Sequence, residues 1–382
     1  MSSTLDELFA TTARRDGSPE PPPRLAVRMP DGQMRVYGDG DPAAVVVVRD
    51  ARGVAALLSR DEVTVGEAYM DGSLEVEGEF LAVLALRGSL RDRHPLWRLL
   101  RFVRPLLRGQ VSADREVVPE HYEREEDFWL AFLDRRHRCY SHGLFEHDQE
   151  SLEDAMTRKL QAALSAVNAQ PGDRLLDIGG GWGAMTEFAG KRGVRVTSLT
   201  IAEESRKYLE HLIAREDLPC EVLMEHFFEH RPREPYDGIV NLGVTEHLPD
   251  YERTLRHYDA LLKPGGKVYL DASASRAKYD VDTFTQKYIY RGNGRFLCLH
   301  EYLEEVAKSP FEPESVVNDR ASYALTATRW AENLEASRDE IERRWGGRLF
   351  RLFRLYLWNT ARSFGRGHKQ AYRVVLRRTD DR

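Results

Sequence analysis

The chain has only three cysteines among its 382 residues, and Cys139, Cys220 and Cys298 lie far apart. Such isolated cysteines, odd in number, provide neither a disulfide framework nor the paired spacing of a structural zinc site. No other spacing of His or Cys indicates metal ligation. We therefore expect reduced thiols and no bound metal.

Long apolar runs are absent too. No segment approaches the roughly 20 apolar residues that a transmembrane helix needs, and residues 1–10 lack the basic start and apolar run of a secretion signal. A cytoplasmic location is the expectation. A basic excess is also missing, because the formal net charge is −6, so nucleic acid is not expected as a partner.

What remains is an ordinary globular composition, with 42 % hydrophobic and 31 % charged residues. Three regions are predicted. Residues 1–23 end in a stretch rich in Pro, Gly, Ser and charge and are expected to form a mobile tail. Residues 24–110 are expected to form a small α+β domain and a basic amphipathic linker helix, with strands near 24–29, 35–37 and 44–48 and a helix near 52–58. Residues 111–382 form the third region.

The linker helix is predicted from the stretch between Arg87 and Arg108, in which seven arginines are interleaved with leucine, tryptophan, phenylalanine and valine. Such a helix can lie peripherally on an anionic membrane surface. It can equally be an inter-domain helix whose apolar stripe faces a core. The sequence leaves both interpretations open.

The third region alternates predicted strands and helices, which indicates a mainly parallel sheet with helices on both faces, the doubly wound α/β class. Its candidate strands span 174–179, 194–200, 220–225, 236–243, 266–274 and 371–377.

The most informative motif in this region is Asp177-Ile-Gly-Gly-Gly-Trp-Gly183, which follows the first of these strands. Glycines let the backbone turn tightly and approach a ligand, and the following helix start offers free amides. The even spacing of Gly179, Gly181 and Gly183 after Asp177 differs from that of dinucleotide-binding dehydrogenases and resembles the S-adenosylmethionine loop of class I methyltransferases. Thr200 and the segment 225–227 end the next two strands, where ligands of such sheets bind.

Further motifs, taken together, resemble the cyclopropane fatty acid synthase and mycolic acid cyclopropane synthase family. They are Val65-Gly-Glu-Ala-Tyr-Met-Asp-Gly-Ser-Leu-Glu75, Tyr140-Ser141 followed by Phe145-Glu146, Glu246-His247 after the fourth strand, and Tyr323. The resemblance implies a seven-stranded class I methyltransferase sheet. It also implies methyl transfer from S-adenosylmethionine to the double bond of an unsaturated fatty acyl chain, giving a cyclopropane or a methyl or methylene branch.

The resemblance assigns residues to two sites. The expected cofactor-binding residues are Tyr140, Ser141, Asp177, Gly179, Gly181, Gly183, Thr200, Ile201, His226 and Phe227. The expected catalytic residues are His142, Glu246, Asp271 and Tyr323, which correspond to the cage that holds a bicarbonate base in the family.

Two of the four cage positions depart from the family, which usually has Cys in place of His142 and His in place of Asp271. A carboxylate beside Glu246 would repel bicarbonate unless a proton or a cation intervened, so this base is questionable here. We hypothesise that His142 acts as a protein base oriented by Asp271.

Three functions follow. The first is methylation of an unsaturated acyl lipid, which the tail-region aromatics Trp345, Phe350, Phe353, Tyr356, Trp358 and Phe364 could serve by lining an acyl tunnel, although their helical spacing is also typical of core packing. The alternative is C- or N-methylation of a soluble metabolite, for which an altered base site would suffice. The third is a cofactor-binding regulatory protein without catalysis. A homo-oligomer is compatible with each.

Overall fold

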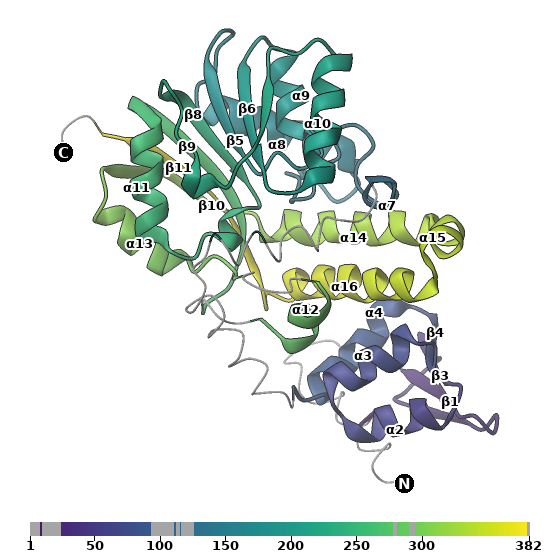
Figure 1. Cartoon of the computed structure of the whole chain (residues 1–382). Helices are drawn as coiled ribbons and strands as arrows, with labels where there is room; N and C mark the ends of the chain where they lie inside the picture. The colour runs from purple at the N-terminus through teal and green to yellow at the C-terminus, as the bar shows by residue number, and fades with distance from the viewer. Residues whose placement is uncertain are drawn as a thin grey trace. The chain divides into compact units, whose positions relative to one another are not determined.

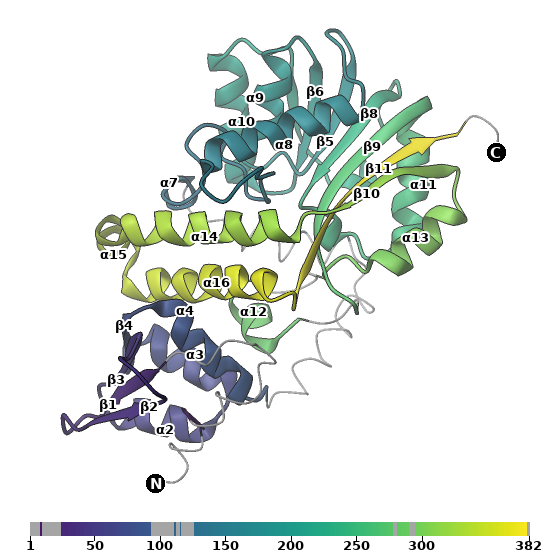
Figure 2. The ribbon, with the colours of Figure 1, turned by 180° about the vertical axis from the view of Figure 1, so that it is seen from behind.

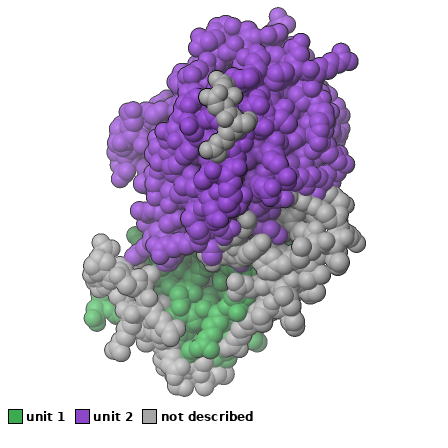
Figure 3. Space-filling view, turned by 90° about the vertical axis from the view of Figure 1, so that its left-hand side faces the viewer, with its two compact units in different colours: residues 1–100, 282–289, 334–362 green, residues 101–281, 290–333, 363–382 purple. Residues whose placement is uncertain are grey.

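The computed structural model describes residues 8–9, 24–92, 111, 115, 126–277, 281–289 and 295–379. The chain divides into two compact units, coloured separately in Figure 3. Unit 1 consists of residues 1–100, 282–289 and 334–362, and unit 2 consists of residues 101–281, 290–333 and 363–382. The sequence predicts one continuous boundary near residue 110, whereas both units combine separate segments of the chain.

Unit 1 contains a four-stranded sheet with the strand order β2-β1-β3-β4. Its strands are β1 (Leu25–Arg28), β2 (Met34–Tyr37), β3 (Ala44–Val48) and β4 (Leu74–Gly78), and its N-terminal helices are α2 (Ala51–Ser59), α3 (Glu62–Met70), α4 (Phe80–Val83) and the 3₁₀ helix η1 (Leu84–Ser89). Asp50 and Asp61 cap α2 and α3, because their side chains accept hydrogen bonds from Gly53 N and Thr64 N.

Three further helices lie wholly or mostly in unit 1. They are α12 (Thr283–Tyr288), α15 (Arg338–Trp345) and most of α16 (Gly347–Gly365). The core of the unit also contains Leu8 and Phe9, which are buried, with Phe9 stacked on Tyr37 at 4.8 Å. The predicted mobile tail is therefore wrong at these two apolar residues. The other residues of 1–23 lie outside the described part.

The tail-region aromatics belong mainly to the packing of α16. Phe350, Phe353 and Phe364 are buried, and Trp358 packs against the core of unit 1. This arrangement matches the core-packing interpretation of their helical spacing. The basic amphipathic linker helix was predicted at 87–108, and its residues beyond 92 lie outside the described ranges.

Unit 2 contains the predicted seven-stranded sheet, with the order β10-β11-β9-β8-β5-β6-β7. Its strands are β5 (Arg174–Ile178), β6 (Arg195–Thr200), β7 (Glu221–Met224), β8 (Tyr236–Leu242), β9 (Leu262–Ala274), β10 (Phe311–Asn318) and β11 (Gln370–Arg378). The strands β5 to β9 pair in parallel, and β11 and β10 pair antiparallel at one end. Strand β10 escaped the sequence prediction because its Glu312, Pro313 and Glu314 are exposed, as suits an edge strand.

Helices cover both faces of this sheet. In Figures 1 and 2, α9 and α10 lie on one side of the sheet and α11 and α13 on the other. The helices of unit 2 are α7 (Glu126–Leu130), α8 (Leu152–Ala166), α9 (Ala184–Gly190), α10 (Glu203–Arg215), α11 (Tyr251–Leu261), α13 (Leu299–Ala307) and most of α14 (Arg320–Ala336). The doubly wound α/β prediction is confirmed. Within the described ranges, none of the helices has the length and apolarity that a membrane-crossing segment requires.

Candidate active site

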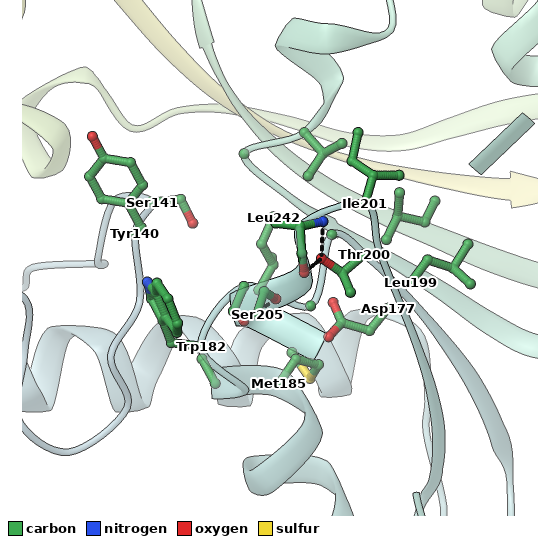
Figure 4. A pocket seen from close by; sticks show the side chains of 18 of the residues that line it. Tyr140, Ser141, Asp177, Trp182, Met185, Leu199, Thr200, Ile201, Ser205 and Leu242 are labelled. Carbon is green, nitrogen blue, oxygen red and sulfur yellow. Dashed lines mark hydrogen bonds between the residues drawn. The ribbon is translucent and has the colours of Figure 1, made fainter. Parts of the chain in front are cut away.

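A cavity of about 150 Å³ lies at the carboxyl ends of β5, β6 and β8. This is the place where doubly wound sheets bind their ligands. Figure 4 shows Tyr140 and Trp182 on one side of this cavity and Leu199, Thr200 and Ile201 on the other. Nine of the ten predicted cofactor-binding residues line it: Tyr140, Ser141, Asp177, Gly179, Gly181, Thr200, Ile201, His226 and Phe227.

The tenth residue, Gly183, lies outside the lining and has a packing role. It precedes α9 with φ +78°, and a Cβ at this position would lie 2.4 Å from Leu212 Cδ2 on α10. Gly179 has the same φ, and its Cβ would lie 2.4 Å from Val244 Cγ2. Gly181 has φ +51° and faces open space, since its Cβ would meet only Gly179 O at 3.8 Å. The loop therefore leaves a cradle that side chains would obstruct.

Asp177 begins this loop at the end of β5 and is buried. Its carboxylate accepts a hydrogen bond of 3.1 Å from Ser198 Oγ. Burial raises the pKa of Asp177 to about 7, although the Ser198 hydroxyl and the charge of Lys159 oppose this shift. A hydrogen bond from a ligand to this carboxylate would stabilise its ionised form.

Sequence reasoning assigned no role to two lining residues that hold the loop in place. Arg138 donates from Nε to Trp182 O at 3.2 Å and also pairs with Glu187 of α9. Ser205 Oγ donates to Gly181 O at 2.7 Å. Both residues line the cavity. The positive φ of Arg138, +62°, depends on the folded loop and leaves no signature in the sequence.

A second cavity, of about 30 Å³, shares Tyr140, Ser141, Gly243 and His247 with the first. This volume accommodates a group of one or two waters in size. Its other lining residues are Glu246, Ser273, Val281, Arg295, Phe296 and Tyr323. Of the four predicted catalytic residues, Glu246 and Tyr323 therefore line this cavity, and His142 and Asp271 lie behind it.

Within the part of the chain that the structure describes, only one of the two carboxylate oxygens of Glu246 is held by hydrogen bonds. Its Oε1 accepts hydrogen bonds from Ser273 N at 2.6 Å and from Ser273 Oγ at 2.7 Å. Its Oε2 is buried and has no hydrogen-bond partner among the described residues. Burial raises the pKa of Glu246, and the nearby charge of Asp271 acts in the same direction. The side chain therefore presents a carboxyl oxygen that can exchange a proton with a group in the cavity.

His142 does not pair with Asp271, which corrects the predicted dyad. Its Nε2 lies 3.4 Å from Asp319 Oδ2, and its Nδ1 is buried without a hydrogen-bond partner in the described structure. The ring stacks on Tyr323 with 5.0 Å between centroids. Phe364 also stacks on the ring of Tyr323, with 4.0 Å between the ring centroids. His142 therefore fixes the ring of Tyr323 and does not face the cavity.

Asp271 pairs with Lys159 of α8, with Nζ 3.1 Å from Oδ2, and both side chains are buried. Lys159 also donates to the hydroxyl of Ser141. Gly243 makes room there, since a Cβ on it would lie 3.0 Å from Ser141 Cβ. The ion pair thus supports the wall that separates the two cavities.

These positions do not form the bicarbonate cage that the resemblance implies. His142 is directed to Asp319, Asp271 is directed to Lys159, and both donors of Ser273 are used by Glu246. No step of the reaction is therefore assigned to bicarbonate.

A group that could bind a metal lies elsewhere. Cys298, His300 and Glu301 bring their ligand atoms within 4.8 Å of one another, although no metal site was expected from the sequence. None of the three lines either cavity. This group therefore plays no part in the site described above.

The strand order, the glycine loop and the cavity beyond the strand ends define a class I S-adenosylmethionine-dependent methyltransferase. The model of the mycolic acid cyclopropane synthetase family matches residues 110–374, and a domain of unknown function matches residues 23–92. The chain belongs to the mycolic acid cyclopropane synthetase family, which confirms the resemblance found in the sequence.

Individual relatives agree. The chain is 29 % identical to the cyclopropane-fatty-acyl-phospholipid synthase of Escherichia coli over 355 residues, which cover 89 % of each protein. It is 27 % identical to the sphingolipid C9-methyltransferase of Komagataella phaffii over 340 residues, covering 82 % of this chain and 69 % of that protein. The solved cyclopropane synthase MmaA2 of Mycobacterium tuberculosis superposes with a TM-score of 0.65 at 26 % identity, covering 69 % of this chain and 98 % of that one.

The glycine loop yields a first prediction. Gly179→Ala should weaken S-adenosylmethionine binding about tenfold or more, because the added methyl group displaces Val244, which lines the cavity. Gly265→Ala is the matched control, since Gly265 also has a positive φ, +72°, but has no atom within 4 Å of an added Cβ. Isothermal titration with the cofactor measures both variants. Equal affinities for both would contradict the assigned role of the loop.

The buried ion pair yields a second prediction. Lys159→Met and Asp271→Asn should each destabilise the protein by about 3–5 kcal/mol, because each leaves one buried charge without its partner. The double variant should lose clearly less than the sum of the two. The exposed pair Lys207 and Glu204 is the control, for which Lys207→Met and Glu204→Gln should each leave the stability nearly unchanged, because solvent screens an exposed pair. Urea unfolding measures all five variants, and strict additivity at 159 and 271 would refute the coupling.

Proposed function

We propose that the enzyme transfers the methyl group of S-adenosylmethionine to the double bond of an unsaturated acyl chain of a lipid, forming a cyclopropane or a methyl or methylene branch. The observation that supports this most directly is the carboxyl group of Glu246, which lines a small cavity that adjoins the cofactor cavity and has a buried oxygen with no hydrogen-bond partner among the residues that the structure describes. The cofactor, when bound, supplies an electrophilic methyl group.

An alkene needs no deprotonation before it attacks. Its π electrons form a bond to the methyl carbon as the methyl–sulfur bond breaks, and a cation is left on the acyl chain. Aromatic faces stabilise cations, and Tyr140 and Phe296 line the small cavity. Glu246 then accepts a proton from the cation, and the released C–H electrons close the ring or form a new double bond.

The remaining predicted residues act behind this cavity. His142 positions Tyr323 by stacking, and Asp271 positions Ser141 through Lys159. Asp177, Thr200 and the glycine loop are proposed to hold the cofactor, together with the aromatic side chains of Tyr140 and Phe227. This assignment replaces the hypothesis of a His142 base, since His142 does not line either cavity.

The relatives support a lipid acceptor. The Escherichia coli protein is named for fatty-acyl phospholipids and the Komagataella protein for sphingolipids. These acceptors differ in their head groups and share long hydrocarbon chains. We therefore propose that the acceptor of this enzyme is also a hydrocarbon chain. We propose no particular head group for the lipid that carries it.

The proposed reaction predicts that purified enzyme transfers label from methyl-labelled S-adenosylmethionine to vesicles of dioleoylphosphatidylglycerol. Mass spectrometry of the acyl chains should show a gain of one methylene unit, with or without added bicarbonate. Vesicles of the saturated dipalmitoyl lipid are the control and should remain unlabelled, because they offer no π electrons. Label found only in a water-soluble product would favour the soluble-metabolite alternative. Cofactor binding without any transfer would favour a regulatory protein.

The proton acceptor yields a prediction on pH. Because the pKa of Glu246 is raised, its carboxyl group stays protonated at pH values at which an ordinary glutamate is already ionised. In the protonated form it cannot accept a proton. The rate of methyl transfer to the acyl chain should therefore fall as pH decreases through that raised pKa. Glu246→Gln should lower kcat on the order of 10²–10⁴-fold and abolish this dependence, with cofactor affinity retained because Glu246 does not line the cofactor cavity.

The matched control for this measurement is Glu252→Gln, since Glu252 is an exposed residue at the start of α11. It should keep the pH profile and kcat of the original enzyme. A Glu246→Gln variant with the same pH profile as the original enzyme would exclude Glu246 as the proton acceptor.

A further inference from the structure

Unit 1 contains a separate cavity of about 110 Å³, and all of its lining residues belong to that unit. Its walls come from α3, β4, α4 with η1, α12 and α16, and these helices lie next to one another in both ribbon views (Figures 1 and 2). Most of the lining is aliphatic or aromatic, as Val65, Val76, Val83, Phe284 and Leu355 illustrate. No role has been assigned to it by the reaction described above.

The polar groups in the lining satisfy one another. Arg87 donates from Nε to Glu62 at 2.7 Å and from Nη1 to Asn359 at 2.8 Å, and its Nη2 lies 3.0 Å from Asp282. One guanidinium thus faces two carboxylates, and the cluster has no excess positive charge. Among the described lining residues, none has a buried polar side-chain atom without a partner. A ligand of this cavity therefore needs neither hydrogen-bonding groups nor a negative charge.

The size of the cavity also indicates an occupant. Protein interiors are close-packed, and apolar voids larger than a methyl group destabilise the fold. An engineered apolar cavity of roughly 150 Å³ stays dry and takes up a small hydrocarbon. The cavity in unit 1 approaches that volume. Val65, Val83 and Leu355 are only half-buried, so the cavity is not sealed by its lining.

We propose that unit 1 binds the methyl end of one hydrocarbon chain of a membrane lipid in this cavity. The branched aliphatic lining is complementary to methylene groups, and the Arg87 cluster, in which one cation faces two carboxylates, offers no attraction to a carboxylate or phosphate. Unit 1, which contains the matched segment of unknown function at residues 23–92, would thereby hold lipid independently of the catalytic unit. Binding there requires no methyl transfer, so it can be tested apart from the proposed reaction.

The test uses the full-length enzyme and phosphatidylcholine vesicles whose acyl chain has a diazirine near its methyl end. After irradiation, peptide mass spectrometry should find crosslinks on the segments that contain Val65, Val83 and Phe284. Val83→Phe should reduce this labelling several-fold, because the larger ring fills the cavity. Val36→Phe is the matched control, since Val36 is 42 % exposed on β2 and does not line the cavity, and its labelling should be unchanged.

A second filling variant, Val65→Phe, guards against misfolding of the first, and circular dichroism and cofactor binding show whether each variant folds. The Glu246→Gln variant should be labelled like the original enzyme, which separates failure of this proposal from failure of the proposed reaction. A free fatty acid with the same diazirine tests the other source of a hydrocarbon chain, and stronger labelling of unit 1 by the fatty acid than by the phospholipid would overturn the assignment to a membrane lipid. Wild-type labelling of both folded filling variants, or no labelling of unit 1, would overturn the proposal.

Discussion

The active site depends on the buried ion pair between Lys159 and Asp271. A charge inside a protein requires a partner, and each of these two side chains provides the other's. The pair joins α8 to β9, and its ammonium group also holds the hydroxyl of Ser141, which lines both cavities. The same positive charge favours the ionised form of the Asp177 carboxyl at the start of the glycine loop. One buried cation therefore links the cofactor loop, the wall between the cavities and the central sheet.

Features that depend on local sequence could be predicted. Five consecutive parallel strands and the glycine turn have short, regular patterns in the sequence. Because ligands of such sheets bind at the strand ends, residues such as Asp177, Thr200 and Phe227 could be placed at one cavity. Strands β4 and β10 could not, because neither has the apolar character of a buried strand. Glu75 and Glu77 lie in the first, and Glu312 and Glu314 in the second.

Contacts between residues distant in the chain could not be predicted. His142 and Asp319 are separated by 177 positions, and the sequence does not distinguish Asp319 from Asp271 as the partner of the imidazole. A periodic apolar face likewise shows that a helix packs against something, without showing what. The apolar residues of α16 were recognised, yet their packing with the N-terminal sheet core in unit 1 became evident only from Leu355 and Trp358. The discontinuous composition of the two units could not be predicted for the same reason, because it too results from contacts between residues distant in the chain.

The two cavities of the catalytic unit share a wall formed by Tyr140, Ser141, Gly243 and His247. A ligand that orders these residues from one side changes the surface offered on the other side. Thermodynamic linkage then requires reciprocity: whatever factor the bound cofactor contributes to acceptor affinity, the bound acceptor contributes to cofactor affinity. With donor and acceptor placed as proposed, affinity for the methyl donor and choice of acceptor are therefore not independent traits, and a sequence change in the shared wall is expected to alter both.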